Sequence, residues 1–176
     1  MTARRRFPSR AAGTLVPLTE ARRTFPRLPE VKFPDVLNEL RLRDHSVEPP
    51  SESMAYPVFV QATDADGNAL GGIRHPMIGA PLATHTGWSL RASGYGEGDL
   101  FTIQGSMIPF AQTEAKRQRA GDPRPSLEAR YASRDVWAAG LAAAADRLVT
   151  ERLLLPEDGK RLLAAARESW DVYQAL

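Results

Sequence analysis

Alternation of apolar and polar residues is concentrated in the middle of the chain, between residues 56 and 110. Residues 56–64 are rich in Val, Phe and Thr, which favour a β-strand. Residues 69–74 can return antiparallel to them, because Asp66-Gly67-Asn68 lies between the two runs and is a strong turn signal. Glycine tolerates positive φ, and its two neighbours bond the local backbone. The pattern predicts a central β-hairpin followed by loops.

The hydrophobic period changes to that of helices after Pro109. A short polar helix is expected over residues 113–120, ended by Gly121 and the prolines after it. Ser133 is expected to cap a longer helix, and Pro156 to end that helix and begin another. The apolar stripe of the first long helix consists of Trp137, Leu141, Ala144 and Leu148. That of the second consists of Leu162, Ala166, Trp170 and Tyr173. The two stripes predict a C-terminal antiparallel helix pair.

The first third of the chain holds most of the 14 prolines, which prevent long helices there. Residues 1–53 are therefore expected to be mostly irregular, extended and lying over another part of the protein. A short strand is predicted at residues 13–16, and a short helix or extended segment at residues 36–42. The chain divides into segments 1–55, 56–110 and 111–176, read as a Pro-rich extended segment, a hairpin and loop segment, and a helical segment. Together they form one partial domain.

Composition places the chain among folded globular proteins, with 43% hydrophobic and 25% charged residues over 176 positions. The net charge of +2 comes from dispersed arginines, and the basic run at residues 4–6 lacks the interleaved aromatics of a nucleic-acid arm. Absence of cysteine excludes disulfides, thiolate nucleophiles and cysteine metal sites. No apolar run is long enough for a membrane span or a secretory leader, so a cytoplasmic location is the default expectation.

The candidate nucleophiles and base lie in the central segment. His85 is a candidate general base, because imidazole titrates near neutrality, although a lone histidine beside an aromatic more often packs or hydrogen-bonds. Ser89 lies in Gly87-Trp88-Ser89-Leu90-Arg91, which falls short of G-x-S-x-G because Arg91 takes the fifth place and a loop follows where a helix should start. Ser106 has no glycine at the matching position either. A nucleophile elbow is therefore not expected.

The acidic candidates are Asp64, Asp66 and Asp99, any of which could orient His85 in a free-standing serine hydrolase. The spacing of these residues cannot show that they converge. Asp64, Asp66 and Asn68 could also hold calcium. Counted from Asp64, however, an EF-hand needs glycine sixth and glutamate twelfth, and neither is present, so a turn is favoured. The glycines at 94, 96 and 98 do not form G-x-G-x-x-G. No metal and no cofactor is expected.

Eight sequence blocks together resemble the C-terminal part of a family of bacterial α/β-hydrolase domain proteins. The blocks are GTLVP (13–17), FPRLPEVKFPDVLNEL (25–40), YPVFVQATDADGN (56–68), GGIRHP (71–76), PLATHTGW (81–88), GSMIPFAQT (105–113), GDPRPSLEARY (121–131) and ERLLLPED (151–158). The resemblance implies an incomplete α/β fold of the α/β-hydrolase type. It also implies an esterase-like family that uses a serine, histidine and acid triad.

The same resemblance implies that the catalytic residues lie elsewhere. In the family, the nucleophilic serine and the catalytic histidine precede the block matching residues 8–17, so this chain would be a truncated portion that is inactive alone. Relatives more often have tyrosine at position 85 and asparagine at position 89, so His85 and Ser89 inherit no role. The missing N-terminal hydrolase portion, or a second copy, is the expected partner, because a sheet edge without its neighbours exposes apolar surface. A non-enzymatic module that wraps a protein partner and a free-standing serine hydrolase remain the alternatives.

Overall fold

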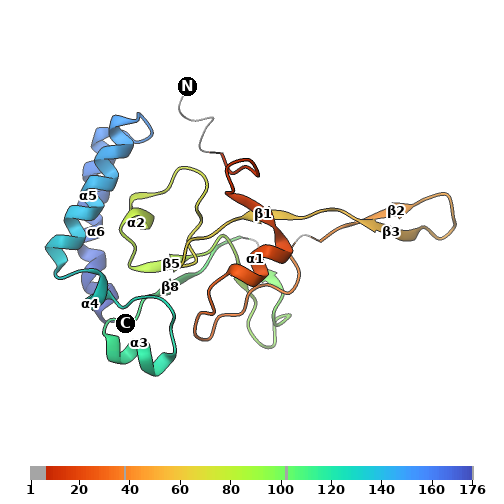
Figure 1. Ribbon diagram of the computed structural model, residues 1–176, viewed down its shortest axis with the longest axis horizontal. Coiled ribbons are helices and arrows are strands. Elements are labelled where there is room, and N and C mark those ends of the chain that lie inside the picture. The colour runs from red at the N-terminus through yellow and green to blue at the C-terminus, as the bar shows by residue number, and fades with distance from the viewer. Residues whose placement is uncertain (1–6, 38, 102, 176) are drawn as a thin grey trace.

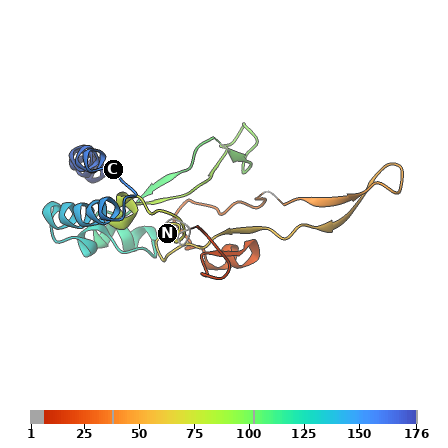
Figure 2. The same cartoon turned by 90° about the horizontal axis from the view of Figure 1, so that it is seen from above.

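A computed structural model describes residues 7–37, 39–101 and 103–175 of the chain. Two long helices, α5 (Arg134–Thr150) and α6 (Pro156–Ala175), lie side by side at one end (Figure 1). Short strands and loops occupy the middle, and a long hairpin projects from the opposite end, as the perpendicular view also shows (Figure 2). The molecule therefore consists of a helical layer, a body of small sheets and an arm.

The predicted helix pair is confirmed, and its two apolar stripes meet in the core. The chain runs along α5 and returns along α6 (Figure 1). Trp137 is fully buried, and its ring lies 5.2 Å from the Trp170 ring, centroid to centroid. The Trp137 indole Nε1 donates to the carbonyl oxygen of Ala80 at 3.0 Å, which ties α5 to the strand layer. The main core cluster consists of Ala80, Leu82, Ala83, Phe110, Leu127, Trp137, Leu141, Ala166 and Tyr173.

The cap of α5 gives a first prediction. The Ser133 side chain accepts a hydrogen bond from the Val136 backbone N–H at 3.3 Å. Replacing Ser133 with alanine leaves that N–H without its partner, so we expect the free energy of unfolding to fall by about 1 kcal/mol. Urea unfolding followed by circular dichroism measures the change. Ser169→Ala, inside α6, is the matched control, and an equal loss there would contradict the capping role.

The shorter helices follow their sequence signals. Helix α3 (Glu114–Ala120) begins after Thr113, whose side chain accepts from the Lys116 N–H at 3.2 Å. It ends at Gly121, which has φ of 64° in the left-handed region that glycine adopts at little cost. Two single-turn helices complete the set, α2 (Pro76–Gly79) and α4 (Leu127–Arg130). The prediction of a helix over residues 113–120 is confirmed to within one residue.

The strands form four small antiparallel sheets of two strands each. Strand β5 (Ala83–His85) pairs with β8 (Met107–Pro109), and β6 (Ser89–Leu90) pairs with β7 (Leu100–Phe101). Strand β1 (Leu15–Pro17) pairs with β4 (Phe59–Gln61). Strand β2 (Arg41–Asp44) pairs with β3 (Ser51–Ala55) in the projecting arm. All strand pairs in the described part of the chain are therefore antiparallel.

The predicted return strand over residues 69–74 is wrong. The turn forms, but only an isolated bridge between Thr63 and Ala69 and one hydrogen bond from the Leu70 N–H follow it. Gly72, with φ of 85°, and Pro76, which opens α2, direct the chain away from the first strand. Strand β4 pairs instead with β1 from the first third of the chain. The hairpin is thus a closed turn without two full strands.

The first third is more regular than expected. The predicted strand at residues 13–16 is present as β1, but helix α1 (Leu18–Thr24) and the β2–β3 arm were not expected. Helix α1 fits between Pro17 and Pro26, so the prolines flank it rather than interrupt it, and it buries Leu18 and Ala21. Both strands of the arm are exposed along their whole length, so no hydrophobic alternation marks them. Within residues 36–42, Asn38 lies outside the described residues, and β2 begins at Arg41.

Candidate functional site

The turn predicted at residues 64–68 is the centre of a polar cluster. The Asp64 Oδ1 accepts hydrogen bonds from the backbone N–H groups of Asp66 at 3.1 Å and Asn68 at 2.9 Å. Gly67 has φ of 83°, and its N–H donates to the Asp64 carbonyl oxygen at 2.9 Å. One oxygen of the Asp64 carboxylate is therefore occupied by hydrogen bonds that close the turn. A closed turn was the interpretation favoured over calcium binding.

Asn68 attaches this turn to strand β5. Its side chain is fully buried; Nδ2 donates to the Ala83 carbonyl oxygen at 3.2 Å, and Oδ1 accepts from the His85 N–H at 2.8 Å. The Thr84 hydroxyl, between those two residues, donates to the Asp66 carbonyl oxygen. The amide of Asn68 thus pairs with the β5 backbone as a neighbouring strand would. This arrangement explains why a polar residue can be buried here without loss of stability.

The most buried charges in the cluster are Arg124 and Asp122, whose side chains are 2% and 4% exposed. The Arg124 guanidinium donates to the Asp122 carboxylate through Nε at 2.9 Å and Nη2 at 2.6 Å. It also donates to the Thr84 hydroxyl at 2.8 Å and to the carbonyl oxygens of Ile108 and Pro109. Burial alone raises the pKa of Asp122, but the hydrogen bonds from Arg124 outweigh it and hold that pKa below its ordinary value.

Two further arginines hold the acidic residues of the turn. Arg130 binds Asp66 with both terminal nitrogens, and its guanidinium stacks on the Phe110 ring at 4.1 Å from the centroid. Arg74 binds the second oxygen of Asp64 at 2.6 Å. The carboxylates of Asp64 and Asp66 are therefore fixed by arginines. The Asp66 pair holds the turn against the helical segment, and the Asp64 pair joins the turn to the loop of residues 70–79.

In the described part of the chain, the residues proposed as a catalytic set are not joined to one another by side-chain hydrogen bonds, although Ser106 directly precedes Met107, the strand partner of His85. The Ser89 hydroxyl, in β6, donates to the Gln104 carbonyl oxygen at 3.1 Å. Ser106 contributes its backbone N–H to the Thr86 hydroxyl at 3.0 Å. Asp99 lies in the turn between β6 and β7, where its backbone bonds Gly96. Among the described residues, no hydrogen bond joins the His85 imidazole to a serine hydroxyl or a carboxylate. The hydrogen bonds of the described residues therefore do not link these groups as a triad.

His85 is half-buried at the end of β5, and burial lowers its pKa below the ordinary value of 6.5, with a further lowering from the charge of His75. Burial also lowers the pKa of His75. The unfolded chain therefore takes up these protons first as the pH falls. The stabilisation by neutral imidazoles is complete above pH 6.5 and is lost as the pH falls towards the folded-state pKa values.

A second prediction follows from the two histidines. The free energy of unfolding, measured by urea titration, is expected to fall between pH 7.5 and pH 5.5. Replacing both His75 and His85 with glutamine is expected to remove most of that fall, because no imidazole then has to be protonated on unfolding. His45→Gln, at an exposed position in the arm, is the control and should leave the fall unchanged. If the double variant keeps the pH dependence of the parent chain, the fall in the free energy of unfolding does not come from His75 and His85.

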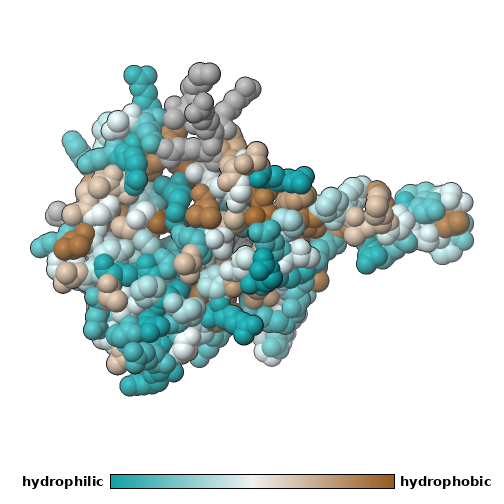
Figure 3. Space-filling model, in the orientation of Figure 1, coloured by the Kyte–Doolittle hydropathy of each residue, from teal (hydrophilic) through white to brown (hydrophobic). Residues whose placement is uncertain are grey.

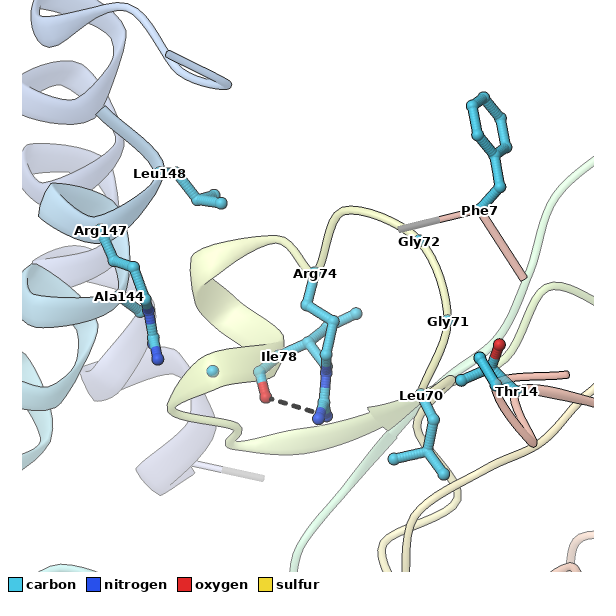
Figure 4. Close-up of a pocket in the computed structure, with 12 residues that line it drawn as sticks. Phe7, Thr14, Leu70, Gly71, Gly72, Arg74, Ile78, Ala144, Arg147 and Leu148 are labelled. Carbon is cyan, nitrogen blue, oxygen red and sulfur yellow. Dashed lines mark hydrogen bonds between the residues drawn. The ribbon is translucent and has the colours of Figure 1, made fainter. Parts of the chain in front are cut away.

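Two cavities lie beside the polar cluster. The first, of about 470 Å³, lies between α5 and the loop of residues 70–79, and its lining includes Arg74 and Arg147 (Figure 4). The second, of about 370 Å³, is lined by described residues that carry no charge. It lies beside the aromatic cluster of Phe25, Phe33 and Trp88, whose ring centroids are 5.3 to 5.8 Å apart.

Arg74 and Arg147, the two arginines of the first cavity, were not identified as candidate site residues from the sequence. The apolar stripe of α5 identified only its buried face, and Arg147 lies outside that stripe. Arg74 follows the double glycine Gly71-Gly72, which was noted only as part of a family block. The juxtaposition of an exposed helical arginine with a glycine-rich loop depends on tertiary packing. No local pattern in the sequence marks it.

Small antiparallel sheets, a helix pair and a buried arginine and aspartate cluster define a mixed α and β domain. A family model described as "Alpha/beta hydrolase domain" matches residues 34–164, so the chain belongs to this α/β-hydrolase domain family. No curated protein and no solved structure matches the chain. None of the helices in the described residues is both long and apolar enough to span a membrane.

Proposed function

We propose that this chain is a supporting portion of an esterase-like α/β-hydrolase protein and that it does not supply the catalytic serine and histidine. Membership of the hydrolase family supports the first half of the proposal. Among the described residues, no hydrogen bond joins the His85 imidazole to the hydroxyl of Ser89 or Ser106; this supports the second half and is the observation that carries it. A hydrolytic serine needs a base within hydrogen-bond reach and donors for the oxyanion.

The bonding of two of the three candidate acids, Asp64 and Asp66, supports the same conclusion. Asp64 and Asp66 are each paired with an arginine, and Asp64 also closes its own turn. A carboxylate in that position holds a fold together and has no free oxygen to orient an imidazole. The chain would then contribute a structural segment to a hydrolase. In this segment the polar cluster joins the turn, β5 and the helical segment through hydrogen bonds and ion pairs.

Ester hydrolysis tests this proposal. The purified chain is expected to hydrolyse a short-chain p-nitrophenyl ester no faster than the background rate, with circular dichroism confirming that it is folded. The same rate is expected for Ser89→Ala, Ser106→Ala and His85→Ala. Turnover by the parent chain that is abolished by His85→Ala and by one serine variant would overturn the proposal in favour of a free-standing serine hydrolase.

The projecting arm favours a second role, in binding a protein partner. An isolated two-stranded hairpin is marginally stable in water, and both strands of this arm are exposed. Its surface carries apolar patches along with polar ones (Figure 3). The exposed apolar residues in and beside the arm are Leu40, Leu42, Val47, Met54 and Tyr56. We propose that the arm lies against another hydrolase segment or against a second copy of the chain.

Light scattering at several protein concentrations distinguishes the two proposed partners of the arm. If the arm binds a second copy, the chain is expected to dimerise with rising concentration, and replacing residues 42–54 by a two-residue Asn-Gly turn should leave it monomeric. A monomer at every concentration would rule out the second copy. A hydrolase segment can also be co-expressed with the chain. If it co-purifies as well with the shortened chain as with the chain that keeps its arm, the arm does not bind that segment.

A further inference from the structure

The cavity beside α5 has an unbalanced charge. Arg74 and Arg147 belong to its lining, and none of the described lining residues is an aspartate or glutamate. Its volume of about 470 Å³ falls in the range of roughly 300–1,000 Å³ typical of small-molecule pockets. We propose that this cavity binds an organic monoanion, a carboxylate on an apolar body. This site shares Arg74 with the polar cluster, but it goes beyond the proposed supporting role and requires no turnover by the chain.

Arg74 is only partly neutralised by its acidic neighbour. Because Asp64 Oδ1 is taken up by the turn, only Oδ2 meets the guanidinium, through Nη2. The same Nη2 has a long contact of 3.5 Å with the Ile78 carbonyl oxygen (Figure 4). The Arg74 Nε is the one side-chain nitrogen or oxygen of the described chain that is buried without a hydrogen-bond partner. A buried donor in this state gains free energy when an acceptor reaches it.

Arg147 supplies the second positive charge from the opposite wall. It projects from α5 on the side that faces the loop of residues 70–79 (Figure 4). Within the described part of the chain, its guanidinium forms neither a hydrogen bond nor an ion pair. Among the described lining residues and their ion-pair partners, two arginines and the Asp64 carboxylate leave a net charge of +1. That charge matches a monoanion better than a neutral molecule or a dianion.

The loop and the apolar walls of the cavity indicate which chemical groups a ligand would carry. Gly71 and Gly72 line the cavity, and their backbone N–H groups donate to no other described residue. Backbone N–H groups in a glycine turn are common anion donors. The remaining wall is aliphatic and includes Leu70, Ile78, Ala144 and Leu148. A carboxylate near the arginines and glycines would therefore place its apolar body against these side chains.

Octanoate is a suitable probe, with octanol and acetate as controls that lack the charge or the apolar body. In ¹⁵N-labelled full-length chain, octanoate is expected to shift the Gly71 and Gly72 amide signals and the Arg74 Nε–H signal in a saturable manner. Octanol and acetate are each expected to bind at least about tenfold more weakly. Shifts confined to the surroundings of Phe25, Phe33 and Trp88, or equal binding of octanol, would overturn the proposal.

Arg147→Gln tests the second arginine. Arg147 is exposed, so the variant is expected to fold normally while binding octanoate about tenfold more weakly, a loss of about 1.4 kcal/mol. Arg119→Gln removes the same charge from an exposed position in α3 and should leave the affinity unchanged. Equal affinities for the parent chain and Arg147→Gln, or an equal loss in both variants, would contradict a specific site.

Discussion

Replacing Arg124 with alanine is expected to lower the free energy of unfolding by about 3–5 kcal/mol, the cost of removing one partner of a buried ion pair. The Asp122 carboxylate, 4% exposed, would be left without its counter-charge. The Thr84 hydroxyl and two strand β8 carbonyl oxygens would also lose a donor. Because domains are stable by only about 5–15 kcal/mol, this loss would remove a large part of the total stability.

Urea unfolding followed by far-ultraviolet circular dichroism measures this loss. Arg119→Ala, an exposed arginine in α3, is the matched control and is expected to change stability by no more than about 0.5 kcal/mol. Replacing Asp122 and Arg124 together should cost less than the sum of the two single changes, because the double variant buries no unpaired charge. A loss below about 1 kcal/mol in Arg124→Ala would show that the cluster does not hold the layers together.

Replacing Trp137 with alanine is expected to cost about 3–5 kcal/mol, because it leaves a large cavity in the core. Trp137 is completely buried, packs against the Trp170 ring and donates to the Ala80 carbonyl oxygen. The substitution removes the ring contact between α5 and α6 and the hydrogen bond to the strand layer together. The near-ultraviolet circular dichroism signal of the packed tryptophans should weaken accordingly.

The adjacent residue gives the control for that prediction. Val136 lies on the other side of α5 and is 51% exposed, so Val136→Ala is expected to change stability by no more than about 0.5 kcal/mol. Thermal and urea unfolding of both variants can be compared directly, since each change is to alanine in the same helical turn. Similar losses in the two variants would mean that α5 is not anchored through Trp137.

The helical segment was predictable because its signals are local. Ser133, Gly121 and Pro156 mark helix ends through their own backbone and side-chain chemistry, and the apolar stripes repeat within each helix. The turn at residues 64–68 was predictable for the same reason. In each of these cases the residues that decide the structure lie within a few positions of one another.

The sheet partners were not predictable from local pattern. Strand β4 pairs with β1, more than 40 residues earlier in the chain, and nothing in either short strand specifies the other. The arm carries no buried face, so hydrophobic alternation could not reveal it. The charge cluster escaped notice for a related reason: Arg130 and Asp66 are 64 residues apart and meet only in the folded chain. Long-range pairs of this kind decide whether an acid is structural or catalytic.

Labelling with a serine-reactive fluorophosphonate, followed by mass mapping of the modified peptide, tests the central claim most directly. We expect no specific labelling of the folded chain at Ser89, whose hydroxyl is bonded to the Gln104 carbonyl oxygen, or at Ser106. Stoichiometric labelling of either serine that disappears in His85→Ala would contradict the account. Such a result would place a complete hydrolytic site within residues 56–110.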